Sequence, residues 1–509
     1  MRSEKQNRKS ALHTPQSQIR NPQSQIRNPH FSICVFGLTL TRLKKYHNQQ
    51  TFMKRIYSLL SVIFFPLHLF AQAGSTSDAF LLYQGVQGEA SGGGGLGITT
   101  FGNDVFYTLN FSPDLAFGKV GIGLDVNLRI SQSGQLRQED WNDGISSYLR
   151  LVRYVRYGNK YDSLYIRVGQ LDFTRLGHGS IVNLYRNNGS YDARRVGVEF
   201  DMDFGNYGFE SMISDLSNFN IVGLRAYNRP LFSTDIPVLS KLQIGASYVV
   251  DFSRQANVTR GGGFVSISNG RELFYDSLAI RRGNLTVIGV DAGLPLLRSP
   301  IFEMDAYMDI VKIIGYGSGL AIGVTGTIPN VLGVIQLSSR LEHRVVGDQF
   351  QFAYFDAIYE QDRFISFENG QIITRANELA NFSAPGPGVY GDLGGVIFGK
   401  VRLFGSYQRL YRTPRSGQLN LGMRLVDAIP SVFFRADYYK RDLGFETELF
   451  TLDDRSLSIV ELGYFPYPYL LFSMIYQWTY LAVRDDAGAI LRYAPVRRIE
   501  PRVTFQLNF

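Results

Sequence analysis

The sequence predicts an all-β fold, a closed antiparallel transmembrane β-barrel of about 20 strands, within a range of about 18–22. Three observations support this prediction. Apolar and polar residues alternate along one segment after another. After residue 73 no run of about 18 apolar residues occurs, so a membrane-spanning helix is not expected there. The chain also ends on an alternating segment whose last residue is aromatic.

The alternation is clearest in residues 120–131, 196–204, 470–480 and 502–509. Successive side chains of a strand point to opposite faces, so each segment has one apolar and one polar face. Soluble sandwiches share this pattern. Here, however, the polar faces carry charges and the aromatic residues gather at strand ends, as in barrels with a wet lumen. The segments also approach the length of about 9–11 residues with which a tilted strand crosses a bilayer.

We expect strands near 94–101, 104–111, 120–131, 147–157, 163–172, 194–204, 207–214, 219–228, 240–252, 285–294, 300–312, 318–328, 331–344, 388–397, 399–411, 417–426, 430–440, 456–465, 470–482 and 498–509. If both chain ends lie on one side of the membrane, alternate connections face the other side. The long connections 132–146, 173–193, 253–284, 345–387 and 441–455 all fall on that far side. The connection 229–239 is the one long exception on the near side.

The amino-terminal region is expected to be removed from the mature protein. Met53-Lys54-Arg55, the apolar run 56–70 and Ala71-Gln72-Ala73 have the anatomy of a signal peptide, which we place at 53–73. Residues 1–52 contain the heptapeptide Pro-Gln-Ser-Gln-Ile-Arg-Asn twice, at 15–21 and 22–28, and we interpret them as a mis-assigned or disordered leader. Residues 74–93 are then a short periplasmic segment, and 94–509 form the barrel.

The basic charge of the whole chain belongs to this leader. The chain has 52 Lys and Arg and 44 Asp and Glu, a net of +8. Residues 1–73 contain 11 of the basic residues and one acidic residue, which leaves 41 basic and 43 acidic residues after them. The predicted mature chain is thus nearly neutral, and its charge does not suggest a nucleic-acid partner.

The last strand carries a further signal. Phe505, Leu507 and Phe509 share its apolar face and end the chain on an aromatic ring. This pattern resembles the carboxy-terminal signature of porin-like Gram-negative outer-membrane β-barrel proteins. The resemblance implies a multi-pass barrel in the cell outer membrane, in contact with outer-membrane lipid. It also implies that the barrel-assembly machinery reads these residues as an assembly signal. A barrel suits lipid because it pairs every backbone group.

The sequence offers few catalytic or metal-binding patterns. The single cysteine, Cys34, lies in the leader. His178-Gly179-Ser180 has a spacing that resembles the outer-membrane phospholipase family, but Asp192 stands where that family places an asparagine. Glu199, Asp201 and Asp203 share one strand face; they could bind Ca²⁺, or simply line a wet wall. His343 has no nearby ligand partner. We expect no catalytic residue, no metal, no cofactor and no enzyme activity.

The function favoured by these features is a porin-like channel for passive diffusion of small hydrophilic solutes. About twenty strands enclose an aqueous path, because barrels of about 16–18 strands already do so. The charges expected on the lumen face are of mixed sign, so strong ion selectivity is not indicated. One alternative is a non-enzymatic barrel of a secretion, assembly or surface-display system that docks partners on its long outer loops. A lipid hydrolase, resting on His178 and Ser180, is the other.

The connection 345–387 is the best candidate for a functional element. Residues 349–364 and 375–381 depart from strand alternation and predict amphipathic helices. One interpretation is a surface cap or a further strand pair. The other is that the connection folds inward and narrows the lumen, with acidic residues facing arginines of the wall. The residues of this possible lumen constriction are Arg340, Asp356, Glu360, Asp362, Arg424 and Arg435.

Overall fold

The computed structural model describes Ala79 and residues 91–508, apart from gaps at 102, 142–146, 149, 191–194, 260–262, 269–270, 277–279, 365, 369–370, 384, 426–427 and 485–489. Contacts divide the chain into Met1–His68 and Leu69–Phe509, and every described residue belongs to the second part. The expected leader, the signal peptide and Phe509 therefore lie outside the described residues.

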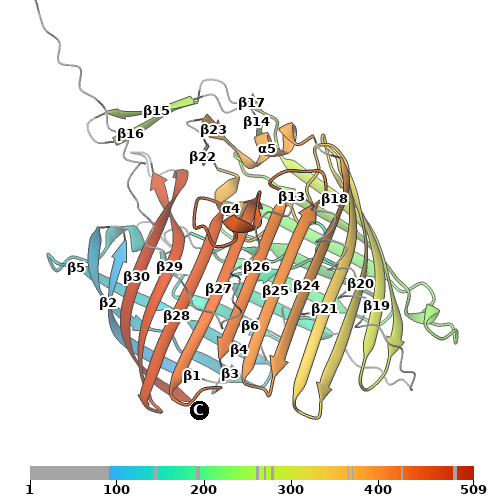
Figure 1. Ribbon diagram of the computed structural model, residues 1–509, viewed down its shortest axis with the longest axis horizontal. Helices are drawn as coiled ribbons and strands as arrows, with labels where there is room; N and C mark the ends of the chain where they lie inside the picture. The colour runs from blue at the N-terminus through green and yellow to red at the C-terminus, as the bar shows by residue number, and fades with distance from the viewer. Residues whose placement is uncertain are drawn as a thin grey trace, which may run out of the picture. The chain divides into compact units, whose positions relative to one another are not determined.

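One antiparallel sheet of 22 strands forms the body of the protein (Figure 1). Its strands are β1 (Ser91–Phe101), β2 (Asp104–Phe111), β3 (Asp114–Phe117), β4 (Val120–Leu124), β5 (Val126–Ser131), β6 (Val152–Tyr157), β7 (Leu164–Gly169), β10 (Gly197–Asp203), β11 (Tyr207–Ile213), β12 (Ile221–Asn228), β13 (Gln243–Asp251), β18 (Leu285–Arg298), β19 (Glu303–Ile313), β20 (Ser318–Val331), β21 (Ile335–Val346), β24 (Gly386–Ile397), β25 (Val401–Leu410), β26 (Gly417–Leu425), β27 (Val432–Leu443), β28 (Ser456–Tyr467), β29 (Leu470–Arg484) and β30 (Ile490–Asn508).

The sheet closes on itself. Strand β1 pairs with β2 on one side and with β30 on the other, where Leu96 lies opposite Val503. Every strand from β6 onward pairs with the next strand of the sheet along the chain. Closure leaves no row of unpaired backbone groups at a sheet edge, and such a row could not be tolerated in lipid.

Two pairs of short strands act as single bent crossings. Strands β2 and β3 are interrupted at Ser112-Pro113, and both pair with β1. Strands β4 and β5 are interrupted at Asp125; β4 pairs with β3 and β5 pairs with β2. Counting each pair once reduces the 22 strands of the sheet to 20 crossings, 22 − 2 = 20. The prediction of an all-β antiparallel barrel with about twenty strands is confirmed, and every expected strand is present.

The remaining elements are short and lie in the connections. They are η2 (Gln138–Asp140), β8 (Asp172–Thr174), β9 (Tyr185–Arg186), η3 (Leu239–Lys241), β14 (Val258–Thr259), β15 (Gly263–Ser268), β16 (Arg271–Asp276), β17 (Ile280–Arg281), α4 (Tyr359–Asp362), β22 (Ser366–Glu368), β23 (Gln371–Ile373), α5 (Arg375–Asn381) and η4 (Glu446–Glu448). In the described part of the chain, no helix is long and apolar enough to cross a membrane.

The two rims of the barrel differ in their connections. At the rim where β1 begins and β30 ends, which we call the terminal rim, most turns are short, and 229–242 is the longest connection. The opposite rim, the loop rim, carries the long connections with α4, α5 and the small strand pairs (Figure 1). The expected division of short and long connections is confirmed. Helix α5 matches the second expected helix, whereas the first is reduced to the single turn α4.

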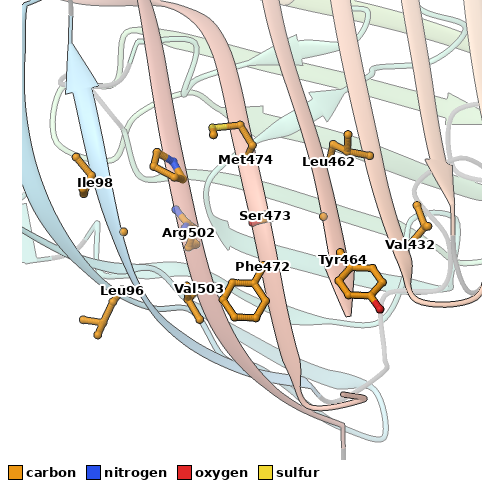
Figure 2. A pocket seen from close by; sticks show the side chains of 13 residues that line it. Leu96, Ile98, Val432, Leu462, Tyr464, Phe472, Ser473, Met474, Arg502 and Val503 are labelled. Carbon is orange, nitrogen blue, oxygen red and sulfur yellow. The ribbon is translucent and has the colours of Figure 1, made fainter. Parts of the chain in front are cut away.

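The strand faces have the predicted phase. Outward residues are apolar and exposed, such as Leu96 at 65% and Met474 at 48%, whereas the inward Ser473 is 8% exposed. Figure 2 shows this outer wall across β1 and β27–β30, where apolar side chains line a shallow depression of 770 Å³. Tyr464 and Tyr469 are exposed near the terminal rim, like the aromatic girdles of membrane barrels. The architecture is that of a multi-pass outer-membrane β-barrel.

Candidate functional site in the barrel interior

Two long connections of the loop rim fold into the barrel. We call residues 170–196 the first inward segment and residues 347–385 the second. Their backbones meet where Val182 forms a parallel bridge with Phe355. The Ala353 N–H donates to the Ser180 carbonyl over 2.9 Å. The inward course of the second segment, which the sequence left as one of two interpretations, is the one present in the structure.

The inward segments and the barrel wall share an apolar core. Phe355 and Tyr359 of the second segment are fully buried. They belong to one cluster with inward wall residues such as Met212 and Val287, on β11 and β18. Gly319 on β20 makes the approach possible, because a Cβ there would lie 2.3 Å from the Phe350 ring. The helical spacing of aromatic residues in 349–364 thus marks the face that packs against the wall.

The acidic residues of the second segment are buried among arginines. Asp356 pairs with Arg375 at 3.0 Å, and Asp362 pairs with Arg375 at 3.2 Å and with Arg441 at 2.7 Å. Glu360 pairs with Arg363 at 2.7 Å. These pairs join α4 to α5 and to β27.

Helix α5 presents Arg375 at its first position. The preceding Thr374 caps the helix, because its Oγ1 accepts a hydrogen bond from the Asn377 N–H.

Burial raises the pKa of Asp362 to about 7, against the opposing effect of Arg455 and Arg375.

The expected arginine partners in the wall lie elsewhere. Arg340 on β21 bonds Asp392 on β24, with its Nε 2.9 Å from Oδ2. Arg435 bonds Asp437 on its own strand at 2.9 Å. The structure therefore does not bring the acidic residues of the second segment to Arg340 or Arg435. Alternation identifies inward residues, but the partner across the lumen depends on how the segment packs.

Arg424 belongs to a row of arginines that the sequence reasoning missed. Arg402 on β25 lies in register with Arg424 on β26, and Arg424 lies in register with Arg435 on β27. All three face inward near the terminal rim and keep partial solvent exposure. Directly opposed residues of adjacent strands have Cβ atoms about 4.5–5.5 Å apart. The row places three arginines side by side on one part of the lumen wall, where acidic residues also lie, since Arg435 pairs with Asp437 and lies in register with Glu461.

His178 and Ser180 lie on the first inward segment and face the wall. The His178 ring stacks on Tyr307 of β19, with centroids 4.1 Å apart and planes 8° apart. Its Nε2 lies 3.9 Å from Oδ1 of Asp291 on β18. The Ser180 hydroxyl donates to Asp309 of β19. Ser180 is thus buried in the barrel with its proton directed at a carboxylate, an arrangement that does not resemble a serine activated by histidine at a lipid-facing rim.

The three carboxylates that could have bound Ca²⁺ lie on the barrel wall and have partners within the protein. Asp201 pairs with Lys160 at 2.7 Å, and Asp203 pairs with Arg229 at 2.9 Å. Glu199 accepts a hydrogen bond from the Tyr165 hydroxyl at 3.0 Å. These carboxylates have protein partners, as a charged lumen wall requires. His343 is exposed on the outward face of β21, and Asp192 lies outside the described residues.

Sequence reasoning did not single out Arg225, Asp291, Tyr307 and Asp309 of the inner wall. Arg225 on β12 donates to Asp291 from Nε at 2.9 Å and from Nη2 at 2.6 Å. Asp291 and Asp309 lie directly opposite each other in the pairing of β18 with β19. The alternation of those two strands predicts that both carboxylates face inward. That they lie opposite each other depends on the register of the two strands, which the sequence reasoning did not assign.

No protein-family model matches the chain, and no curated protein matches it. Similar solved structures include OccK11 (OpdR) of Pseudomonas aeruginosa, at 10% identity and a TM-score of 0.29, covering 83% of this chain and 95% of that one. OccK2 (OpdF) of the same organism, solved with glucuronate, has 12% identity and a TM-score of 0.29, covering 83% and 98%. A mutant of its ferric enterobactin receptor PfeA, solved with enterobactin, has 10% identity and a TM-score of 0.30, covering 82% of each chain.

Proposed function

We propose that the protein is a porin-like channel of the Gram-negative outer membrane that passes small hydrophilic solutes by diffusion. The observation that carries the proposal is a closed barrel of 20 crossings with an apolar outer wall and a charged, polar inner wall. The two inward segments narrow the path from the loop rim.

We infer the orientation of the barrel in the membrane from the lengths of its connections. Bacterial barrels have short turns on the periplasmic side and long loops outside, so the terminal rim is placed in the periplasm. The apolar outer wall contacts outer-membrane lipid, and the barrel-assembly machinery inserts the chain. Met474 and Phe472, exposed on the outer wall shown in Figure 2, would face acyl chains.

Single-channel conductance in planar bilayers tests the proposal. The wild type is compared with a variant in which 352–382 is replaced by a short Gly-Ser linker. We expect the wild type to conduct and the variant to conduct more, with faster liposome swelling in neutral sugars. The matched control removes the hairpin 263–276, which forms its own two-stranded sheet, and should leave conductance unchanged. A wild type without conductance, or equal conductance in all three, contradicts the proposal.

A second candidate is a closed barrel that serves in secretion, assembly or surface display. The dense packing of Phe355, Ile358 and Tyr359, all fully buried, favours it, because such packing also suits a permanent plug. In that case the wild type would not conduct at all. Co-purification of a stoichiometric partner in mild detergent, together with a silent wild type in bilayers, would establish this candidate in place of the first.

A further inference from the structure

Two carboxylates face each other across adjacent strands inside the barrel. Asp291 on β18 and Asp309 on β19 are register partners, and both side chains are buried on the inner face. Like charges placed directly opposite each other in a sheet are destabilising. Burial increases the cost, because a buried charge requires a compensating partner. A cation near this pair would remove both costs.

The protein supplies such a cation to only one member of the pair. Arg225 bonds Asp291, but its Nη1 also lies 2.6 Å from Glu210, so one positive charge serves two carboxylates. Asp309 accepts a hydrogen bond from Ser180 through Oδ2. Among the described residues, no Lys or Arg forms a salt bridge with Asp309, and its buried Oδ1 has no hydrogen-bond partner. Asp309 is 4% exposed, so little solvent reaches it.

An imidazole nitrogen faces the same place. The buried Nε2 of His178 has no hydrogen-bond partner among the described residues and lies 3.9 Å from Oδ1 of Asp291. The stacked ring of Tyr307 holds the imidazole in position. Gly293 makes room for it, since a Cβ there would lie 3.2 Å from the His178 ring. One possible ligand atom from each of His178, Asp291 and Asp309 lies within 4.8 Å of the others.

We propose that His178, Asp291 and Asp309 bind one transition-metal ion of the Zn²⁺ class inside the barrel. One imidazole and two carboxylates suit such ions, whereas Mg²⁺ and Ca²⁺ prefer oxygen ligands alone. A tetrahedral site with bonds of about 2.0–2.1 Å places its ligand atoms about 3.4 Å apart. The 3.9 Å between His178 and Asp291 therefore needs only a small closing movement. Two positive charges would also balance the two carboxylates, because Arg225 is shared with Glu210.

The metal would join the first inward segment to the barrel wall. His178 belongs to that segment, whereas the two aspartates belong to strands β18 and β19. Arg225 and Ser180 would orient the ligating carboxylates by the hydrogen bonds they already make. The site stands independently of the channel proposal, since metal binding can be measured on the folded barrel whether or not it conducts.

The test uses the full mature chain without a polyhistidine tag, folded in detergent, stripped with EDTA and titrated with Zn²⁺ by calorimetry. We expect about one Zn²⁺ per chain and no heat with Mg²⁺. His178→Ala and Asp309→Asn should each weaken Zn²⁺ binding at least about 100-fold. Loss of a residue that only orients a metal ligand weakens binding by about 10–100-fold, so a larger effect identifies a ligand. His343→Ala, which removes the other histidine of the barrel, is the matched control and should bind as the wild type does.

Several results would overturn the site. A wild type that fails to bind Zn²⁺ shows that the three side chains form no metal site, and equal binding by wild type and His178→Ala places the metal elsewhere. Folding of each variant is checked by heat-modifiable migration on gels. If a variant does not fold, anomalous diffraction at the zinc edge from wild-type crystals decides, and the peak must lie between these three side chains.

Discussion

Arg363 of the second inward segment donates a 2.9 Å hydrogen bond to Oδ2 of Asp251 at the loop-rim end of β13. The same oxygen accepts the Tyr359 hydroxyl, also at 2.9 Å. Asp251 is fully buried and therefore ties two side chains of the segment to the wall. Asp251 and Arg363 are 112 positions apart in sequence, so the anchor joins the second inward segment to a distant strand of the wall.

Asp251→Ala should release the second inward segment. Removing one partner of a buried ion pair costs about 3–5 kcal/mol, because it leaves an uncompensated charge. Hydrogen exchange of the amides in 350–364 should accelerate, and single-channel conductance should rise. Arg415→Ala is the control: its pair with Asp442 at 3.2 Å is half exposed, and such pairs contribute about 0–1 kcal/mol. Equal exchange in both variants would show that Asp251 is not an anchor.

Packing of the second segment should weaken as pH rises. Burial raises the pKa of Asp362 to about 7, whereas an unfolded aspartate has a pKa of about 3.9. Between these two pKa values Asp362 keeps its proton in the packed segment but has lost it in the released segment. The free energy that favours packing therefore decreases as pH rises through that window. Conductance should increase from pH 5 to pH 8. Asp362→Asn should remove the dependence, and a variant that retains it would assign the effect to another group.

A charged substitution should destabilise the barrel more on the outer wall than on the inner wall. Met474→Arg places a cation in lipid and should cost about 2–4 kcal/mol near the bilayer midplane. Ser473→Arg, one position earlier, points into the barrel beside Glu461, whose carboxylate already bonds Ser473 at 2.9 Å. The free energy of unfolding in urea from lipid vesicles measures both. Comparable losses would mean that the assigned faces of β29 are wrong.

The arginine row should contribute to the charge selectivity of the channel. Arg424 lies between Arg402 and Arg435 in register, so Arg424→Glu replaces a positive centre by a negative one. We expect the anion-to-cation permeability ratio, measured from reversal potentials in a KCl gradient, to fall several-fold. The effect should shrink at 1 M salt, where the screening length is about 3 Å. Arg415→Glu, on an exposed loop, is the control and should leave the ratio unchanged.

The terminal aromatic should be needed for insertion. Deleting Phe509 should lower the amount of heat-modifiable barrel in the outer membrane, because the assembly signal would end on Asn508. Phe509→Tyr keeps an aromatic ring and should insert normally. Phe505, which is 58% exposed on the outer wall, should tolerate leucine because an apolar side chain is sufficient at a lipid-facing position. Normal insertion without Phe509 would show that the ring is incidental.

Local sequence pattern by itself predicted the strands, their number to within about two, and the inward or outward face of their residues. Met474 is outward and Ser473 inward because side chains alternate along a strand, and this rule needs no knowledge of neighbours. The lengths of the connections likewise separated the two rims. The helix at 375–381 was also predicted from its local sequence, whereas its cap at Thr374 was found only in the structure.

Only the tertiary structure decided which inward residues meet. Asp362 reaches Arg375 and Arg441, not Arg340 or Arg435, because the path of the second segment across the lumen is set by packing on a closed wall. The same holds for His178 and Asp291, which are brought together when the first segment folds inward. Such contacts join residues far apart in sequence and depend on how the inward segments pack on the closed wall, which local alternation does not record.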